Sequence, residues 1–252
     1  MVGWLIFKHS LKMLLRNFGK ALHIYAVPWI IGVVAVLVVI FIAGLPLDLT
    51  GEGIAAPEDV SAGKLVVVFL SMLVIIILVS LWIAVAWHRY ILMEEAPTGI
   101  LPPIHQDRIA AYLGRGFLLF LAFLVPGVVL VFLLVTLAEV SMTSGIVVGV
   151  VLGFALAVLF YRLSVILPAA ALGQKMSFSE ALEATKGATG PIIVIGLCFL
   201  ALQILIELAL SVVMFIPVIG FVGSILVAMF STMLGISILT TLYGYYVEKR
   251  EV

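Results

Sequence analysis

Long apolar runs alternate with short polar connections along this chain of 252 residues. A helix that crosses a membrane needs about 20 consecutive, mostly apolar residues, and six runs are long enough. The pattern predicts an all-α fold, a polytopic membrane helix bundle with six transmembrane helices and short cytoplasmic amphipathic helices. We expect a single integral membrane domain over residues 1–252. The predicted spans cover residues 24–45, 65–90, 116–138, 146–172, 191–216 and 219–246.

The last two spans are separated only by a tight turn around Pro217 and Gly220. One alternative is a single segment with a kink at these residues. A run of about 55 apolar residues, however, far exceeds the length of one crossing. We therefore predict two spans here.

Nearly all the basic residues flank the predicted spans on one side. The connection 46–63 carries four acidic residues and no Lys or Arg, and only Lys64 of the thirteen Lys and Arg residues lies on its side. Cytoplasmic connections of membrane proteins are enriched in Lys and Arg. This asymmetry predicts that both termini lie in the cytoplasm.

The composition supports a membrane environment and argues against nucleic-acid binding and against a disulfide within the chain. Hydrophobic residues make up 65% of the chain and charged residues 10%, whereas a soluble domain has roughly 25% charged residues. The net charge is zero, so we expect no nucleic-acid partner. The only cysteine, Cys198, can form no disulfide within the chain.

Residues 4–22 have the pattern of an amphipathic helix. Their basic side chains recur every four residues, which places them on one stripe of a helix: Lys8, Lys12, Arg16 and Lys20. We predict that this helix lies on the inner leaflet, with the stripe in contact with lipid. Segments 104–115 and 177–187 resemble shorter versions, and Ser177 and Glu180 have the spacing of a capping box.

Two segments of the chain resemble each other at an offset of 73 residues. AVAWHRY (84–90) aligns with AVLFYRL (157–163), which brings Arg89 onto Arg162. One interpretation is a unit of a surface helix and two spans, used three times. The alternative is a chance similarity between two apolar helix ends.

Two spans carry small residues four apart. The fourth span has Gly145, Gly149, Gly153 and Ala157, and the sixth has Gly220, Ser224, Ala228 and Thr232. Small residues at this spacing let another helix approach closely. We expect both faces to pack within the chain and both helices to be central, with a dimer interface as the alternative.

Arg162 and Glu207 are the only charged residues well inside the predicted spans. Each costs roughly 2.5 to 3.5 kcal/mol at a helix centre on insertion scales. Our hypothesis is that they pair near mid-membrane, with Gln203 and Ser211 completing a polar stripe. In the alternative, Arg162 bends back to the inner headgroups, and Glu207 is protonated or hydrogen-bonded alone.

No catalytic motif stands out. The sequence has no P-loop, no G-x-G-x-x-G after a strand, no H-E-x-x-H and no G-x-S-x-G. The four histidines lack metal-ligand spacing, so we expect no metal or cofactor and interpret them as interfacial anchors. The adjacent Glu94 and Glu95 are interpreted as capping a charged patch.

Two segments, AVAWHRYILMEEAP and YRLSVILPAAALGQKMSFSEALEATKG, resemble a group of bacterial inner-membrane proteins. These are the YciC-like proteins and the membrane domain attached to some glycerophosphodiester phosphodiesterases. The matching positions are Trp87, Arg89, Arg162, Pro168, Ser177, Ala181 and residues 185–187. The resemblance covers roughly residues 80–190 and implies a six-span α-helical fold in the bacterial cytoplasmic (inner) membrane. The sequence contains no phosphodiesterase domain, so that enzymatic activity is not carried over.

These observations favour a non-catalytic integral membrane protein. We expect a scaffold, a lipid-interacting protein or an accessory subunit of a membrane assembly, with membrane lipids or another membrane protein as partners. The alternative is a small transporter or channel that uses Arg162 and Glu207. An integral-membrane lipid enzyme has the least support, because no cluster of His, Asp or Ser occurs at either interface.

Overall fold

The computed structural model describes residues 2–45, 60–97 and 99–251. Within these ranges the chain is helical and has no strand. The helices are α1 (Val2–Arg16), α2 (Phe18–Ile42), α3 (Ala62–Met93), α4 (Gln106–Val140), α5 (Met142–Ser164), α6 (Ile166–Leu172), α7 (Phe178–Ala184), α8 (Thr189–Val213) and α9 (Pro217–Tyr246). The connection 46–59, which carries the acidic residues noted above, lies outside the described residues.

Six helices of the described chain are long and apolar enough to cross a membrane, α5 and α6 together forming one of them. This confirms the predicted all-α fold with six spans. The last two spans are separate helices, since α8 ends at Val213 and α9 begins at Pro217. The segment 104–115 is not a separate surface helix, because α4 runs without a break from Gln106 to Val140.

The fourth span is broken near its end, contrary to the continuous span predicted over 146–172. Helix α5 ends at Ser164 and α6 starts at Ile166. Pro168 has no N–H to donate to the carbonyl of Ser164, which explains the position of the break. Helix α6 then ends at Leu172 and is followed by Gly173, whose φ of +82° is a conformation that glycine adopts readily.

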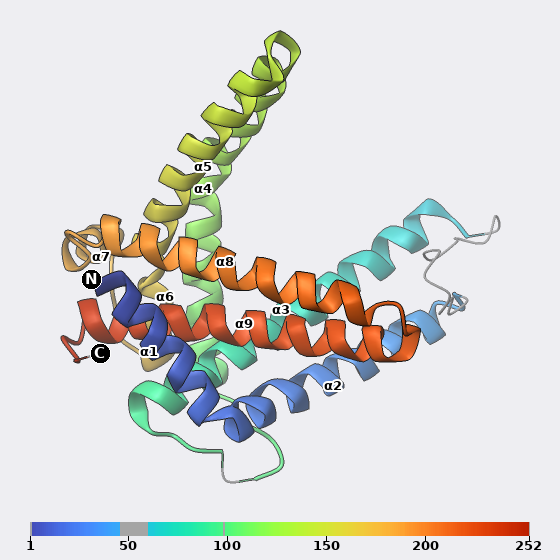
Figure 1. Cartoon of the computed structure of the whole chain (residues 1–252). Coiled ribbons are helices and arrows are strands. Elements are labelled where there is room, and N and C mark those ends of the chain that lie inside the picture. The colour runs from blue at the N-terminus through green and yellow to red at the C-terminus, as the bar shows by residue number, and fades with distance from the viewer. Residues whose placement is uncertain (1, 46–59, 98, 252) are drawn as a thin grey trace.

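Three helical hairpins spread from a common base (Figure 1). The hairpins are α2–α3, α4–α5 and α8–α9. We use "base" for α1, α6, α7 and the adjoining ends of the six long helices. Both described ends of the chain lie there. The α2–α3 and α8–α9 hairpins both extend to the right of the view, whereas the α4–α5 hairpin points upwards, away from them (Figure 1).

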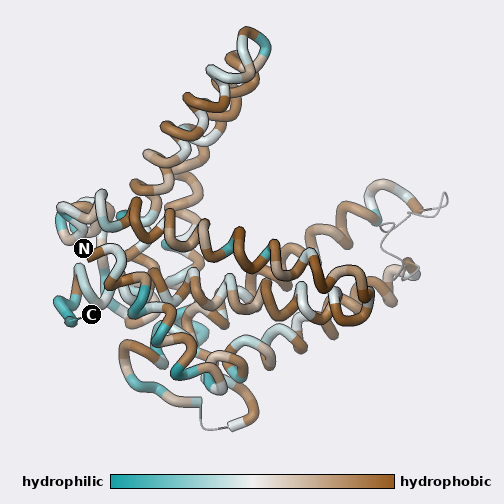
Figure 2. The backbone as a smooth tube through the Cα atoms, viewed as in Figure 1, coloured by the Kyte–Doolittle hydropathy of each residue, from teal (hydrophilic) through white to brown (hydrophobic). Residues whose placement is uncertain are grey.

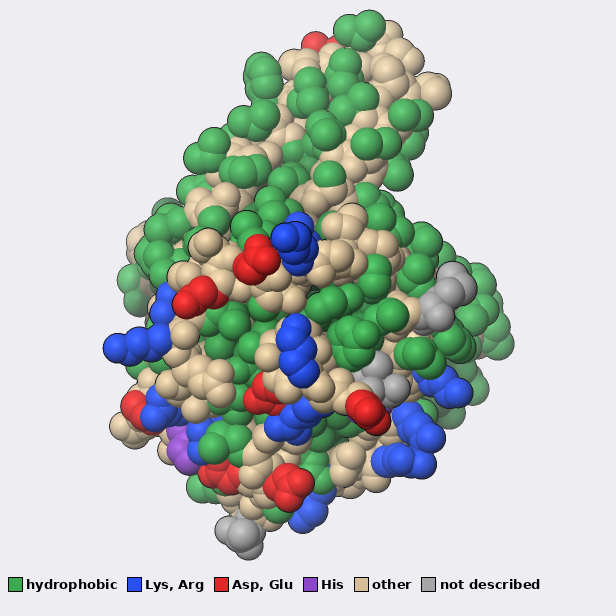
Figure 3. Space-filling model, turned by 90° about the vertical axis from the view of Figure 1, so that its left-hand side faces the viewer, with side chains coloured by type: hydrophobic (Ala, Val, Ile, Leu, Met, Phe, Trp, Pro, Cys, Tyr) green, Lys and Arg blue, Asp and Glu red, His purple; other side chains and the backbone are tan. Residues whose placement is uncertain are grey.

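Polarity follows this arrangement. The arms of the hairpins are hydrophobic, and the hydrophilic residues lie mainly at the base (Figure 2). Viewed towards the base, acidic and basic side chains gather on one face, whereas the projecting hairpin carries mainly hydrophobic side chains (Figure 3). The molecule therefore has one charged end and three apolar arms.

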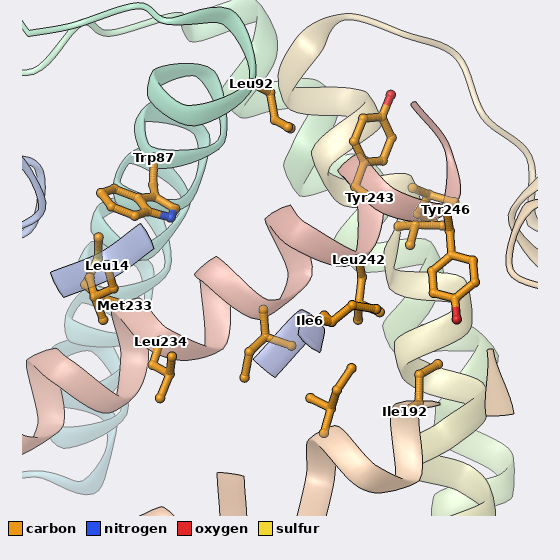
Figure 4. Packing of buried hydrophobic residues seen from close by; sticks show 14 of the residues in the cluster. Ile6, Leu14, Trp87, Leu92, Ile192, Met233, Leu234, Leu242, Tyr243 and Tyr246 are labelled. Atoms are coloured by element: carbon orange, nitrogen blue, oxygen red, sulfur yellow. The ribbon is translucent and has the colours of Figure 1, made fainter. Parts of the chain in front are cut away.

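The main core lies where the hairpins meet. It joins Ile6 and Leu14 of α1, Trp87 of α3, and Leu234 and Leu242 of α9 among other buried side chains (Figure 4). Helix α9 contacts α1, α2, α3, α6 and α8, so it is central as expected. The expectation that α5 is also central is wrong, because the α4–α5 hairpin stands apart from the other arms (Figure 1).

Helix α1 is amphipathic, but its inner face packs on protein rather than on lipid. Gly3, Ile6, Phe7, Ser10 and Leu14 are buried, and the helix contacts α8 and α9. The predicted position of α1 on the inner leaflet therefore needs a correction: the helix covers the ends of two spans. The outer face combines the basic stripe with partly exposed apolar side chains, namely Trp4, Leu5 and Leu15.

Candidate functional site

The base contains a cluster of charged side chains around Glu95. Its two carboxylate oxygens lie 2.6 Å from Arg89 Nε and 2.6 Å from His105 Nε2. Burial raises the pKa of the Glu95 carboxyl, but the hydrogen bonds from His105 and Arg89 outweigh this effect and lower the pKa below its usual value. The cluster ties the end of α3 to the connection that leads into α4.

Three arginines at the base donate to carbonyl groups in the last turn of another helix. Arg89 Nη1 donates to Ala171 O of α6 at 3.2 Å. Arg162 Nη2 donates to Leu182 O of α7 at 2.8 Å, and Arg250 Nη2 donates to Leu92 O of α3 at 2.8 Å.

The last carbonyls of a helix lack partners within the helix, and they carry the negative end of its dipole. Cationic side chains there are stabilising. The three arginines are therefore explained by helix capping. Arg89 and Arg162, which the 73-residue offset aligns, both lie towards the base end of the second helix of a hairpin and cap a short helix.

The predicted pair of Arg162 and Glu207 does not form. Arg162 lies in the last turn of α5, where Nε also donates to Thr185 Oγ1 at 3.3 Å. Glu207 is exposed on α8, and no ion pair joins it to Arg162 in the described chain. The expected position near mid-membrane followed from a continuous span over 146–172, but the break at Val165 places Arg162 at the base.

Gln203, Glu207 and Ser211 lie four residues apart on α8, as predicted, but neither Gln203 nor Ser211 is hydrogen-bonded to Glu207 in the described chain. Gln203 Nε2 donates to Ser231 Oγ on α9 at 2.9 Å, and the Ser231 hydroxyl also reaches Gln203 Oε1 at 3.1 Å. Ser211 Oγ donates to Leu208 O within its own helix. Gln203 thus joins α8 to α9, and Arg162 lies apart from the other three residues proposed for a transport site.

A buried hydrogen-bond chain crosses three helices at the base, and sequence reasoning missed it. His88 is fully buried, with Nδ1 2.9 Å from Thr240 Oγ1 and Nε2 3.3 Å from Tyr112 Oη. Its interpretation as an interfacial anchor is therefore wrong. The Thr240 hydroxyl donates to Ile236 O at 2.8 Å, so it accepts from His88 Nδ1–H, and His88 Nε2 accepts from Tyr112.

This chain links α3, α4 and α9, which belong to three different hairpins. Its three members have no common spacing in the sequence. The only signal was the presence of polar residues, His88 and Thr240, near the ends of apolar runs. We find no group of three or more potential metal ligands within the described ranges.

The small-residue stripe of α5 is only partly a packing face. A Cβ atom on Gly145 would lie 3.3 Å from Ala138 N, and one on Gly149 would lie 2.7 Å from Leu134 Cδ2. Both glycines thus allow α4 and α5 to approach closely. Gly153 has no atom within 4 Å of such a Cβ, and Ala157 is exposed. The predicted packing within the chain holds for half of the stripe.

Crevices open between the helices of the arms. One of about 800 Å³ lies between α2, α3 and α9 and includes Tyr25 and Tyr112 in its wall. A second of about 880 Å³ follows the α4–α5 hairpin. A third of about 580 Å³ lies between α5 and α8, with Arg162 in its wall. All three walls are mainly apolar.

The basic stripe of the first helices is exposed, as a contact with lipid headgroups requires. Lys8, Lys12 and Arg16 lie on the outer face of α1, and Lys20 lies in the first turn of α2. The predicted contact of this stripe with lipid stays a prediction.

No protein-family model, no curated protein and no solved structure matches this chain. The resemblance to the YciC-like proteins stays a prediction.

Proposed function

We propose that this chain is a non-catalytic protein of the bacterial cytoplasmic membrane that binds membrane lipids and acts as a scaffold or accessory subunit. Both termini lie in the cytoplasm in this proposal. The resemblance to YciC-like proteins supports the choice of membrane. The proposal assigns the apolar arms to the bilayer and the charged base to its inner surface.

The exposure of the arms carries this proposal. At most 28% of the most apolar stretch of any span is buried within the chain, and for the α4 and α5–α6 spans the share is 6%. A soluble monomer rarely exposes apolar patches larger than a few hundred Å². Lipid or another membrane protein is therefore needed to cover these helices.

The distribution of charge supports the orientation. All the Lys and Arg side chains named in the helix-capping and charged clusters lie at the base, and Glu139 lies at the other end of α4. An excess of Lys and Arg marks the cytoplasmic side of a membrane protein. The base therefore corresponds to the cytoplasmic side.

The use of the polar groups favours a structural role over catalysis. Arg89, Arg162 and Arg250 cap helices. The His88 side chain is fully buried where α3, α4 and α9 meet. These interactions hold the hairpins together at one end and leave the arms apart. Such an architecture provides lateral surfaces for lipids and for a second membrane protein.

The test is to extract the protein from its membrane with a polymer that retains the surrounding bilayer. The mass of the particle and the identity of every bound molecule are then measured by mass spectrometry. We expect phospholipids that persist after detergent washing, with or without a stoichiometric protein partner. A six-span protein with closely packed helices serves as control. A washed particle that retains neither lipid nor partner contradicts the proposal.

A further inference from the structure

The crevice between α5 and α8 differs from the other two in its chemistry. The helices belong to separate hairpins, meet near the base and diverge away from it (Figure 1). The wall on α5 is apolar and includes Val151, Ala155 and Val158. Ile193 contributes the facing wall on α8.

The end of this crevice nearest the base is polar. Arg162 and Thr189 line it there. Arg162 uses Nε and Nη2 to hold α7, and within the described chain Nη1 has no hydrogen-bond partner. A guanidinium has five N–H donors in a planar fork that suits phosphate oxygens. The crevice therefore combines an apolar wall with donors for an anion.

The other two crevices lack this combination. The described residues that line the crevice between α2, α3 and α9 include tyrosine, serine and threonine but no charged side chain. Those that line the α4–α5 crevice are glycine and hydrophobic residues. Charge complementarity thus singles out the α5–α8 crevice as the one suited to an anionic ligand with an apolar tail.

The dimensions match one leaflet of a bilayer. Val150 and Arg162 mark the two ends of the α5 wall, and twelve residues at a rise of 1.5 Å span about 18 Å. The hydrocarbon core of a membrane is about 30 Å thick, so one leaflet contributes about 15 Å. An acyl chain of the inner leaflet with its phosphate at Arg162 fits this length.

We propose that the crevice between α5 and α8 binds one anionic phospholipid of the inner leaflet, with the phosphate on Arg162 and Thr189 and an acyl chain along α5. This inference rests on the proposed function and adds the class of lipid and its place. The apolar wall retains the chain, and the guanidinium selects a negative headgroup.

The test uses the full chain in nanodiscs of equal parts phosphatidylglycerol and phosphatidylcholine with identical acyl chains. After transfer to mild detergent, native mass spectrometry counts the retained lipids of each class. We expect one retained phosphatidylglycerol, favoured by about tenfold, because the choline ammonium of phosphatidylcholine offsets the phosphate charge and is repelled by the Arg162 guanidinium. A tenfold preference corresponds to about 1.4 kcal/mol. Arg162→Gln should bring the preference close to unity.

A second variant separates binding from folding, because Arg162 also holds α7. Ala155→Trp places a large side chain in the crevice and leaves Arg162 intact, so the retained phosphatidylglycerol should fall by about tenfold or more. The matched control is Ile146→Trp. Ile146 is on the same helix and 57% exposed, but does not line the crevice, and this variant should bind as the wild type does.

Three results would overturn the assignment of this crevice. In the first, the wild type retains the two lipids equally. In the second, Ala155→Trp retains as much phosphatidylglycerol as the wild type does. In the third, the wild type is a particle of two chains, and Ala155→Trp converts it to a single chain. If phospholipid is still retained elsewhere, the proposed function stands and only the site fails. If the wild type retains no lipid and no partner at all, both fail together.

Discussion

Gly3 lies where α1 crosses the start of α8. A Cβ atom at this position would lie 2.9 Å from Val194 Cβ and would also clash with the carbonyl oxygen of Pro191. Backbone cannot move aside as a flexible side chain can. We expect Gly3→Val to reduce the free energy of unfolding by about 1–3 kcal/mol, measured as a lower midpoint of thermal unfolding in detergent.

Gly19 provides the matched control. It lies in α2, and a Cβ atom there would have no neighbour within 4 Å. Gly19→Ala should leave the midpoint unchanged or raise it, because alanine favours a helix over glycine by up to about 1 kcal/mol. If Gly3→Val unfolds at the same temperature as the wild type, the close crossing of α1 and α8 is wrong.

Glu95 should make stability depend on pH. Its pKa in the folded state lies below the ordinary value of 4.5. A carboxyl with a depressed pKa adds stability above its unfolded pKa and loses it as pH falls through the folded pKa. We therefore expect Glu95→Gln to destabilise by about 1 kcal/mol at pH 7, with the difference from wild type shrinking below pH 4.5.

Thermal unfolding of both proteins at pH 7 and at pH 4 measures this difference. Glu183→Gln is the control, since Glu183 and Lys186 form an exposed ion pair at 3.6 Å. It should unfold as the wild type does at either pH. A gap between wild type and Glu95→Gln that widens as pH falls contradicts the role given to Glu95.

At the residue scale, the sequence indicated which side chains are unusual but not which partners they have. Arg162 stood out as a charge within an apolar run, yet its partners lie on α7. The depth of Arg162 was overestimated because the effect of Pro168 on the helix was not taken into account. The partners of His88 come from α4 and α9, and such contacts arise only from tertiary packing.

At the scale of elements, Thr240 joins two hairpins through His88. Replacing it by valine keeps the shape of the side chain but leaves His88 Nδ1–H buried without its acceptor. An unsatisfied buried donor costs about 1–3 kcal/mol. We expect Thr240→Val to lower the unfolding midpoint accordingly and to increase hydrogen exchange at the base ends of α3 and α9.

Thr136→Val is the matched control for this substitution. Thr136 is partly exposed, and its hydroxyl donates only to carbonyls of its own helix, at Phe132 and Leu133. Its loss should change stability little. Equal effects of the two substitutions would show that the His88 chain does not connect the hairpins.

Local signals predicted elements well where the cause is local. Ser177 and Glu180 form the predicted capping box, and α7 begins immediately after Ser177. The periodicity of residues 4–22 predicted one surface helix, but α1 ends at Arg16 and the residues from Phe18 onward belong to the first span, α2. The periodicity also could not show what the apolar face contacts, since lipid and protein present similar apolar surfaces. The small residues of α5 likewise could not show where α4 diverges from them.

At the scale of the whole molecule, the six spans followed from hydropathy because each crossing requires an apolar run of fixed minimum length. The divergence of the α4–α5 hairpin from the other two did not follow. Hydropathy contains no information on the angles between helices, and in a membrane these angles depend on side-chain packing. The concentration of polar contacts at the base explains why the arms meet there and separate beyond it.

This architecture predicts opposite sides for two exposed positions. Met142 is 74% exposed at the tip of the α4–α5 hairpin, and Glu251 is exposed at the base. In a background with Cys198→Ala, we expect Met142→Cys to react with a membrane-impermeant maleimide on intact spheroplasts. Glu251→Cys should react only after the membrane is permeabilised, because the basic end of the molecule faces the cytoplasm.

The Cys198→Ala protein without an added cysteine measures background labelling, and permeabilised membranes confirm that both positions are reactive. The chain crosses the membrane three times between the two positions, so they must lie on opposite sides. Labelling of both positions from the outside, or of neither, would mean an even number of crossings. The arrangement of the three hairpins in the bilayer would then have to be rejected.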